Sequence, residues 1–309
     1  MALKPEPRRV AGQAVVEPHN SLLVGLVQTA RPRQWIKNVL LLAAPFGAGV
    51  ITHADALART AIAFVLFCVA ASGAYFLNDA ADIGADRAHE RKQHRPVASG
   101  LVPVPLAQVI GAAALVVAIA SGFLLVNDEF GIAIASYVAV TLAYTFWLKH
   151  EPVLDLAGVA AGFLIRAIAG GVAAEVWISQ WFIIVVGFSS LFIVTGKRSA
   201  EHLELGDARG DHRITLSTYS ETFLRFVRGA ATAAAFTAYC VWAFEKGQGT
   251  NGALWFELSI IPFVAAMLRY ALMLEQGHGG APEEVFLRDR TLQALGLVWA
   301  GFFAAGIYG

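Results

Sequence analysis

Long apolar runs separated by short polar segments dominate this sequence. A run of about 18 or more apolar residues is long enough to cross the hydrocarbon core of a bilayer as an α-helix. The runs therefore predict an all-α fold: a polytopic membrane helical bundle with nine transmembrane helices, whose cytoplasmic loops cap the functional site. The predicted spans are residues 35–51, 60–77, 103–126, 130–148, 153–174, 178–195, 222–244, 254–274 and 291–308.

The chain before the first span has a different character. Residues 20–30 predict a short amphipathic helix that lies at the membrane interface. Pro32 ends that helix, and Trp35 suits the level of the lipid headgroups. Residues 1–20 are polar, contain prolines and lack the apolar core of a signal peptide, so we expect a disordered tail there. Residues 21–309 then form a single transmembrane helical domain.

Composition agrees with a membrane protein, and the placement of charge adds an orientation. Of the 309 residues, 57% are hydrophobic and 15% charged, and the formal net charge is +0, so nothing indicates nucleic-acid binding. Lys and Arg gather before span one and in the loops after spans two, six and eight, whereas Arg59 and Lys246 fall on the opposite side. The positive-inside rule then places the N-terminus in the cytoplasm and the C-terminus outside a cell (plasma) membrane. Cys68 and Cys240 both lie within spans and indicate neither a disulfide nor a metal site.

An acidic segment follows span two directly. Asn78, Asp79, Asp82 and Asp86 lie at intervals of three and four residues, which places the three acids on one face if the segment stays helical. Aligned carboxylates repel one another, and a hard divalent cation such as Mg²⁺ compensates them best, because it takes oxygen ligands and shares them with substrate phosphates. The alternative is a solvated helix end of mixed charge. We expect a metal site of these four residues, with the three acids as the catalytic groups.

Cations surround this segment and suit phosphate oxygens. Arg91, Lys92 and Arg95 follow one or two turns after the acids. Tyr75 lies one turn before Asn78 and is a candidate hydrogen-bond donor to a substrate, although an interfacial tyrosine explains it nearly as well.

Span five carries two charges that are costly in lipid. Asp155 and Arg166 lie eleven residues apart, close to three helical turns, so both face the same way but are too distant to pair directly. Both are expected to face the bundle interior and water or ligand, which makes both candidates for substrate binding. Arg166 has an anion-binding role in this interpretation, and a buried ion pair is its alternative. Lys149, at the end of span four, is a second anion-binding candidate, with snorkelling to headgroups as the alternative.

The loop after span six begins with Lys197 and Arg198 and continues with scattered acids. Glu201 and Glu204 share a helical face with Lys197, and further acids follow in a glycine-broken stretch. We expect a second ligand-binding cap here, and a topology signal is the alternative. No Gly-rich phosphate loop, Ser-His-Asp set or nucleotide-binding Rossmann pattern is present.

Several of these motifs together resemble a known family. The run Asn78-Asp-Ala-Ala-Asp82-Ile-Gly-Ala-Asp86 is similar to the NDxxDxxxD motif of the UbiA superfamily of intramembrane prenyltransferases. Within that superfamily the chain looks most like the branch that transfers phosphoribose to decaprenyl phosphate. The segments that carry this second resemblance are residues 31–38, 95–100, 154–167 and 196–198.

The resemblance implies a fold, an activity and substrates. The implied reaction moves 5-phosphoribose from phosphoribosyl diphosphate to decaprenyl (polyprenyl) phosphate, with Mg²⁺ as cofactor and diphosphate as product, and supplies a lipid-linked arabinose precursor for cell-wall arabinan. Lys37, Lys149 and Arg166 are then candidates for the acceptor phosphate and the 5-phosphate of the donor, without an assignment between the two. Membrane lipid surrounds the bundle, and a homo-oligomer is compatible with its apolar faces.

One departure from the superfamily pattern is informative. Typical members carry a second aspartate-rich motif after span six, whereas Lys197 and Arg198 stand at the start of that loop here. Cations favour direct binding of an additional phosphate, such as the 5-phosphate of phosphoribosyl diphosphate, and leave the presence of a second metal open. Transfer of a prenyl group to an aromatic or lipid acceptor is the alternative activity. A transporter is a further alternative, but the charges lie mostly at one membrane edge and inverted repeats are not evident.

Overall fold

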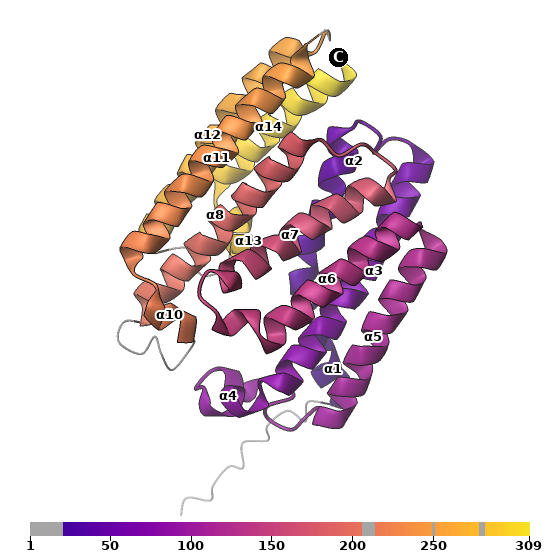
Figure 1. Ribbon diagram of the computed structural model, residues 1–309, viewed down its shortest axis with the longest axis vertical. Helices are drawn as coiled ribbons and strands as arrows, with labels where there is room; N and C mark the ends of the chain where they lie inside the picture. The colour runs from indigo at the N-terminus through magenta and orange to yellow at the C-terminus, as the bar shows by residue number, and fades with distance from the viewer. Residues whose placement is uncertain (1–20, 206–213, 249–250, 278–281) are drawn as a thin grey trace, which may run out of the picture.

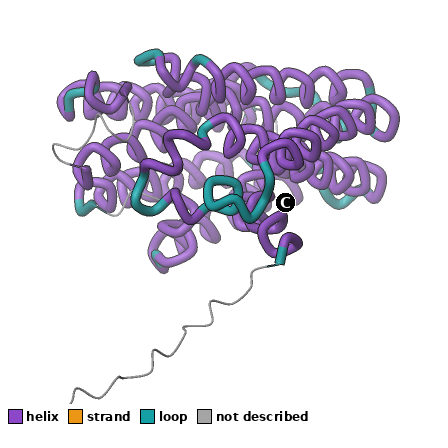
Figure 2. Tube along the Cα trace, turned by 90° about the horizontal axis from the view of Figure 1, so that it is seen from below, coloured by secondary structure: helices purple, strands orange, loops and turns teal. Residues whose placement is uncertain are grey.

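The computed structural model describes residues 21–205, 214–248, 251–277 and 282–309. Within these ranges every regular element is a helix, as Figure 2 shows. The prediction for residues 1–20 lies outside the described residues. The elements are α1 (Leu22–Ala30), η1 (Pro32–Leu42), α2 (Ala43–Gly47), α3 (Ala54–Ala81), α4 (Ile83–Ala88), η2 (Lys92–His94), α5 (Val104–Leu125), α6 (Asp128–Phe146), η3 (Leu148–His150), α7 (Leu154–Ala173), α8 (Gln180–Leu205), α10 (Ile214–Thr218), α11 (Glu221–Gly247), α12 (Ala253–Glu275), α13 (Pro282–Arg288) and α14 (Arg290–Tyr308).

Two apolar cores organise the bundle. The first lies among η1, α3, α5, α6 and α7 and centres on Phe67, Phe130 and Ile134. The second lies among α8, α11, α12, α13 and α14 and includes Phe192 and Tyr270. Figure 1 shows α11, α12 and α14 together on one side and α3, α5 and α6 on the other, with α7 and α8 packed against each other between them. The two halves of the chain therefore meet along α7 and α8.

Most predicted spans are confirmed as single long helices. Seven helices of the described chain are long and apolar enough to cross a membrane: α3, α5, α6, α7, α8, α12 and α14. The predicted span at residues 222–244 falls within α11, a 27-residue helix that carries Arg225 and Arg228 near its start. The nine-span prediction is compatible with this arrangement, although the first span takes a different form.

The segment predicted as span one is broken into two short helices. Pro32 starts the 3₁₀-helix η1, and Pro45 lies in the five-residue α2. Pro45 lacks the N–H that continues a helical ladder, so the segment does not form a single long α-helix. η1 instead packs against α7 at Gly170, where a Cβ atom would collide with the backbone carbonyl of Leu41. This close approach brings the residues of η1 into the interior of the bundle.

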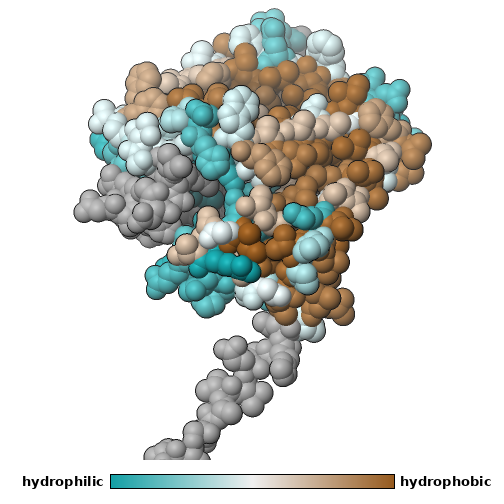
Figure 3. Space-filling model, turned by 60° about the horizontal axis from the view of Figure 1, so that its bottom comes forward, coloured by the Kyte–Doolittle hydropathy of each residue, from teal (hydrophilic) through white to brown (hydrophobic). Residues whose placement is uncertain are grey.

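The surface separates an apolar flank from a hydrophilic end. Large apolar side chains stay exposed on outer helices, for example Leu124 of α5 (81%) and Leu297 of α14 (74%), as expected of faces that contact lipid. Figure 3, with the bottom of Figure 1 brought forward, shows hydrophilic residues grouped beside this flank. The bottom of Figure 1 is the end that carries α4 and α10.

The helix predicted for residues 20–30 forms as α1.

Candidate active site

The acidic segment after span two does not remain one continuous helix. α3 ends at Ala81, Asp82 takes a non-helical backbone conformation (φ −89°, ψ 8°), and α4 starts at Ile83. The break turns the acids in two directions. Asp79 and Asp86 share one arginine partner, whereas Asp82 pairs elsewhere with Asn78 beside it. The expectation of one aligned acidic face is therefore wrong, because the helix ends inside the motif.

Two arginines neutralise the first pair of acids. Arg31 donates to Asp79 Oδ1 at 2.5 Å, and one Arg95 nitrogen lies 3.3 Å from Asp79 Oδ1 and 2.8 Å from Asp86 Oδ2. Both carboxylates are almost completely buried, whereas both arginine side chains remain 27% exposed. The Arg31 guanidinium also lies 4.6 Å from the centroid of the Tyr75 ring, a cation–π contact. Each arginine is therefore fixed by a buried carboxylate while part of its side chain stays accessible.

Asn78 and Asp82 form a second polar group, with Thr145 and Lys149 as their neighbours. Asn78 donates its side-chain amide to Asp82 at 3.1 Å, and the Thr145 hydroxyl lies 3.4 Å from the Asn78 carbonyl oxygen. Lys149 forms an ion pair with Asp82, whose side chain is 28% exposed. Among the described residues no three His, Cys, Asp or Glu side chains gather as a metal-binding group. Asn78 and Asp82 still provide the carboxamide and carboxylate oxygens that Mg²⁺ accepts when it is shared with a substrate.

Asp155 lies at the centre of a buried polar cluster. Its side chain is fully buried and accepts hydrogen bonds from Arg198 at 3.1 Å and from the Tyr219 hydroxyl. Arg198 also donates to Glu201 at 2.7 Å and to the Tyr144 hydroxyl at 3.2 Å. Asp155 and Arg166 are indeed not paired with each other, and the partner of Asp155 comes from α8. Asp155 and Arg198 thus hold α7 and α8 together next to the predicted site.

Tyr219 links this cluster to the turn before α7. Its hydroxyl accepts a hydrogen bond from the Val153 backbone N–H at 2.7 Å while it donates to Asp155. Burial, followed by the hydrogen bond to Asp155, raises the pKa of Tyr219 above its ordinary value. The hydroxyl therefore stays protonated at neutral pH and remains the donor to the carboxylate.

Arg166 lies within the first half of the bundle. It donates to Asn38 Oδ1 and to the Gly162 carbonyl, each at 2.9 Å, and to the Tyr137 hydroxyl at 2.8 Å. The Tyr137 ring also lies 4.6 Å from its guanidinium carbon. Arg166 is 7% exposed, and neutral groups of η1 and α6 surround it rather than a carboxylate. Its charge is therefore solvated by dipoles, an arrangement that leaves it able to attract an anion.

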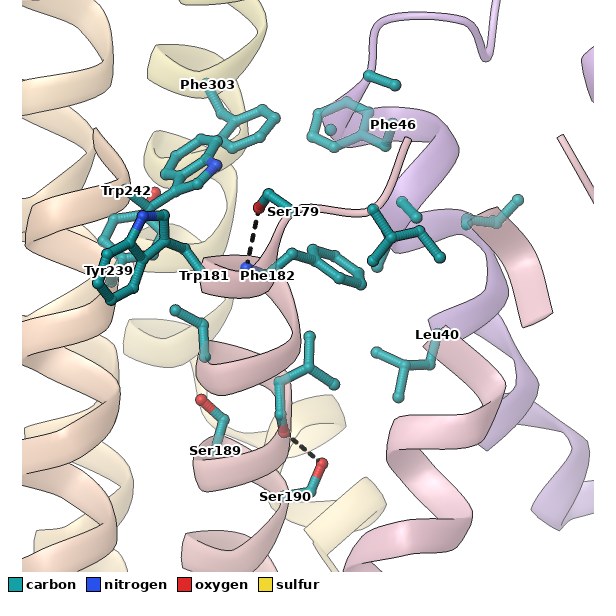
Figure 4. Close-up of a pocket in the computed structure, with 18 of the residues that line it drawn as sticks. Leu40, Phe46, Ser179, Trp181, Phe182, Ser189, Ser190, Tyr239, Trp242 and Phe303 are labelled. Atoms are coloured by element: carbon teal, nitrogen blue, oxygen red, sulfur yellow. Dashed lines mark hydrogen bonds between the residues drawn. The ribbon is translucent and has the colours of Figure 1, made fainter. Parts of the chain in front are cut away.

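A large apolar cavity lies between η1 and α2 on one side and α8, α11 and α14 on the other. Its volume is about 1080 Å³, and Lys37 and Phe163 belong to its lining. Figure 4 shows Tyr239, Trp242 and Phe303 at one end, with Leu40 and Ser190 farther along the wall. Of the predicted site residues, Lys37 is the one in this lining, so the cavity does not include the ionic clusters around Asp79, Asp82 and Asp155.

The remaining predicted cations, Lys197, Arg91 and Lys92, lie at the hydrophilic end of the bundle that carries α4 and α10. The prediction that a loop begins at Lys197 is wrong, because α8 continues to Leu205 and contains this residue. Lys197 is 3.8 Å from Glu201, and its side chain is 42% exposed. The Arg91 backbone N–H donates to the His89 ring at 3.1 Å, and Lys92 starts η2. The Glu204 side chain and the acids beyond it lie outside the described residues. Roles for Lys197, Arg91 and Lys92 in phosphate binding therefore remain predictions.

Comparison with known proteins decides the family. Residues 39–304 match the model of the UbiA prenyltransferase family. The chain belongs to the UbiA family. Decaprenyl-phosphate phosphoribosyltransferase of Mycolicibacterium smegmatis is 45% identical over 96% of both chains, and that of Mycobacterium tuberculosis is 43% identical over 95% of this chain and 97% of its own. The resemblance noted from the motifs is confirmed.

Solved UbiA structures confirm the fold. A UbiA homologue from Archaeoglobus fulgidus bound to GPP and Mg²⁺ has a TM-score of 0.71 at 18% identity, and it covers 91% of this chain and 98% of its own. The same homologue bound to DMAPP and Mg²⁺ has a TM-score of 0.70 at 17% identity, with 91% and 97% coverage. At this identity the likeness establishes the arrangement of helices, and the ligands are those of the homologue.

Three residues of this UbiA site were missed by the sequence analysis. Arg31 reaches Asp79 across 48 positions, Thr145 reaches Asn78 across 67, and Tyr219 reaches Asp155 across 64. Arg31 lies in a segment that carried the resemblance, which was the one available signal. Thr145 and Tyr219 lie at ends of apolar runs, where a hydroxyl has no distinguishing pattern.

Proposed function

We propose that this UbiA protein transfers 5-phosphoribose from phosphoribosyl diphosphate to a polyprenyl phosphate of the decaprenyl type and releases diphosphate. The observation that carries the proposal is the near full-length similarity to relatives named decaprenyl-phosphate phosphoribosyltransferase. Lys197 supports it, because this exposed cation in the last part of α8 stands where the superfamily pattern has a carboxylate for a second metal. The product would be a lipid-linked pentose phosphate, a precursor of cell-wall arabinan.

We assign Mg²⁺ binding to Asn78 and Asp82, whose hard oxygen atoms suit that ion. When bound, Mg²⁺ neutralises the negative charge that develops on the departing diphosphate. Asp79 and Asp86 take another part, because both are almost completely buried against arginines, whereas the Asp82 side chain is 28% exposed. They hold the two arginines where the exposed guanidinium N–H groups can donate to diphosphate oxygens.

The chemistry requires no protein base. The nucleophile is an oxygen of the acceptor phosphate, which is already ionised at neutral pH, so the protein has to orient it and exclude water. Lys149 and Arg166 are assigned to the remaining phosphates of donor and acceptor. Positioning and fixed positive charge then supply most of the rate enhancement.

The apolar cavity suits the polyprenyl chain of the acceptor. Its aromatic and aliphatic lining offers no charge partner for a phosphate apart from Lys37 and Lys246. The tail would lie between the halves of the bundle while its phosphate stays near the ionic clusters. Following the positive-inside pattern, we assign the end with α4 and α10 to the cytoplasm, where phosphoribosyl diphosphate is available.

A donor-label experiment tests this function. Purified protein in lipid vesicles is incubated with polyprenyl phosphate, Mg²⁺ and either labelled phosphoribosyl diphosphate or a labelled prenyl diphosphate. Phosphoribose label should enter the lipid fraction. Entry of the prenyl label alone would instead establish the activity that the GPP-bound and DMAPP-bound homologues represent.

A further inference from the structure

Val153 has a backbone conformation that its side chain disfavours. The residue precedes α7 and has φ 70° and ψ −45°. Only glycine adopts positive φ readily, and a β-branched residue there is a genuine outlier. Such strained residues persist where surrounding contacts hold them, and they occur often at functional sites. The contacts that hold Val153 are therefore informative.

The Tyr219 hydroxyl fixes the backbone of Val153. It accepts the Val153 N–H at 2.7 Å and donates to Asp155, and Asp155 is fixed in turn by Arg198 at 3.1 Å. Tyr219 and Arg198 are each 4% exposed and Asp155 is fully buried, so water offers little substitute for these bonds. We call these four residues the Tyr219 clamp. It joins the turn before α7, the end of α8 and the start of α11.

The turn held by the clamp carries Lys149. Residues 148–150 form η3, and hydrogen bonds from Glu151 N to the Leu148 carbonyl and from Asp155 N to the Glu151 carbonyl continue the turn into α7. The chain thus passes from the lysine to the strained residue within four positions. Lys149 in turn pairs with Asp82 across the site. A change of φ at Val153 would reorient this short turn and move the lysine.

We propose that Tyr219 is a positioning residue for Lys149: its hydroxyl holds Val153 in the left-handed conformation that presents the lysine to Asp82. The part that concerns catalysis rests on the proposed function. The tyrosine ring itself packs on Phe223, with centroids 5.6 Å apart and planes 10° apart. Tyr219→Phe therefore keeps the packing and removes only the hydroxyl.

The first test measures geometry and needs no activity. Both native cysteines are replaced by alanine, Asp82 and Lys149 are replaced by cysteine, and a short bifunctional thiol reagent links the new pair. We expect Tyr219→Phe to lower the crosslinking yield at least threefold and Val153→Gly, added to it, to restore the yield, because glycine adopts φ 70° without help. Tyr270→Phe is the matched control, since Tyr270 is a buried tyrosine of the second core, and it should leave the yield unchanged.

The second test measures kinetics with native Asp82 and Lys149. We expect Tyr219→Phe to reduce kcat/KM about tenfold, in line with the sensitivity of catalysis to small displacements. The substrate whose KM rises should be the one whose KM rises in Lys149→Ala, and Val153→Gly should reverse the effect. A variant that is merely less stable would not raise the KM of one substrate selectively, and Val153→Gly would not restore its activity.

The outcomes separate the two levels of the argument. Unchanged crosslinking in Tyr219→Phe, or a loss that Val153→Gly fails to restore, overturns the positioning role. If Tyr219→Phe does not fold, folding of the Tyr219→Phe/Val153→Gly double variant supports the role and failure of that variant overturns it. The expected crosslinking pattern in a protein that transfers no phosphoribose would uphold the clamp and refute the proposed function.

Discussion

Removal of Arg95 should expose the energetic role of the first acidic pair. Arg95 bridges Asp79 and Asp86, whose side chains are 2% and 3% exposed. Arg95→Ala leaves Asp86 without its ion-pair partner, whereas Asp79 keeps Arg31 at 2.5 Å. Arg31→Ala is the matched control, because it leaves Asp79 paired with Arg95 and does not touch Asp86.

The magnitudes follow from burial. Removing one partner of a buried ion pair costs about 3–5 kcal/mol, because the other charge is left uncompensated. Arg95 itself is 27% exposed, so water compensates part of the loss, and we expect the lower end, about 3 kcal/mol. Arg31→Ala removes one charged hydrogen bond and leaves no acid unpaired, so about 1–2 kcal/mol is expected.

Equilibrium unfolding in mixed detergent micelles measures both values, and a second substitution tests the cause. Asp86→Asn in the Arg95→Ala background removes the unpaired charge and should recover about 2 kcal/mol, since a neutral amide is less costly to bury. Activity should remain low in this double variant, because the donors of Arg95 to diphosphate are still missing. Equal losses in the two arginine variants, or no recovery with asparagine, would refute this account of the acidic pair.

Three further predictions concern the reaction. Asp82→Ala should abolish turnover while thermal unfolding shows a folded protein, because a ligand of the ion is lost; full activity would remove the metal assignment. Chelation of divalent cations should stop label transfer and added Mg²⁺ should restore it; transfer that continues in excess chelator would contradict the cofactor proposal. Lys197→Ala should raise the KM for phosphoribosyl diphosphate several-fold with little change in kcat, and an unchanged KM would argue against 5-phosphate binding there.

The fold was largely predictable because apolar length is a strong signal. Runs such as residues 103–126 have no other explanation than a buried or lipid-facing helix, and α5 follows that run closely. The segment 35–51 was harder, because its apolar content predicts a span while Pro45 interrupts a regular helix. Its path also depends on Gly170, more than a hundred residues away, where the absence of a side chain lets η1 approach.

The sequence could propose residues for the candidate site but not their pairing. Local spacing singled out Asn78, Asp82 and their neighbours, because these polar residues recur at intervals of three and four directly after an apolar run. The helix break at Asp82 was not foreseen, and neither was the assignment of Arg31 to Asp79. Which side chains pair across the bundle depends on how whole helices pack. Until that packing is known, an arginine or tyrosine at a helix end has many possible partners that are equally far away in the sequence.

The gap between the two cores has a consequence for the durability of the protein outside a cell. The two main cores lie in separate halves, which a smaller cluster of Leu156, Val194 and Leu224 joins. An occupant of the cavity that touches η1 on one wall and α11 and α14 on the other would add contacts between the halves. A molecule that binds only the folded form raises the free energy of unfolding with its concentration. Extraction that removes long-chain lipid would therefore first weaken the contacts between the two halves. The enzyme should stay folded and active longer in patches of native bilayer than in detergent micelles.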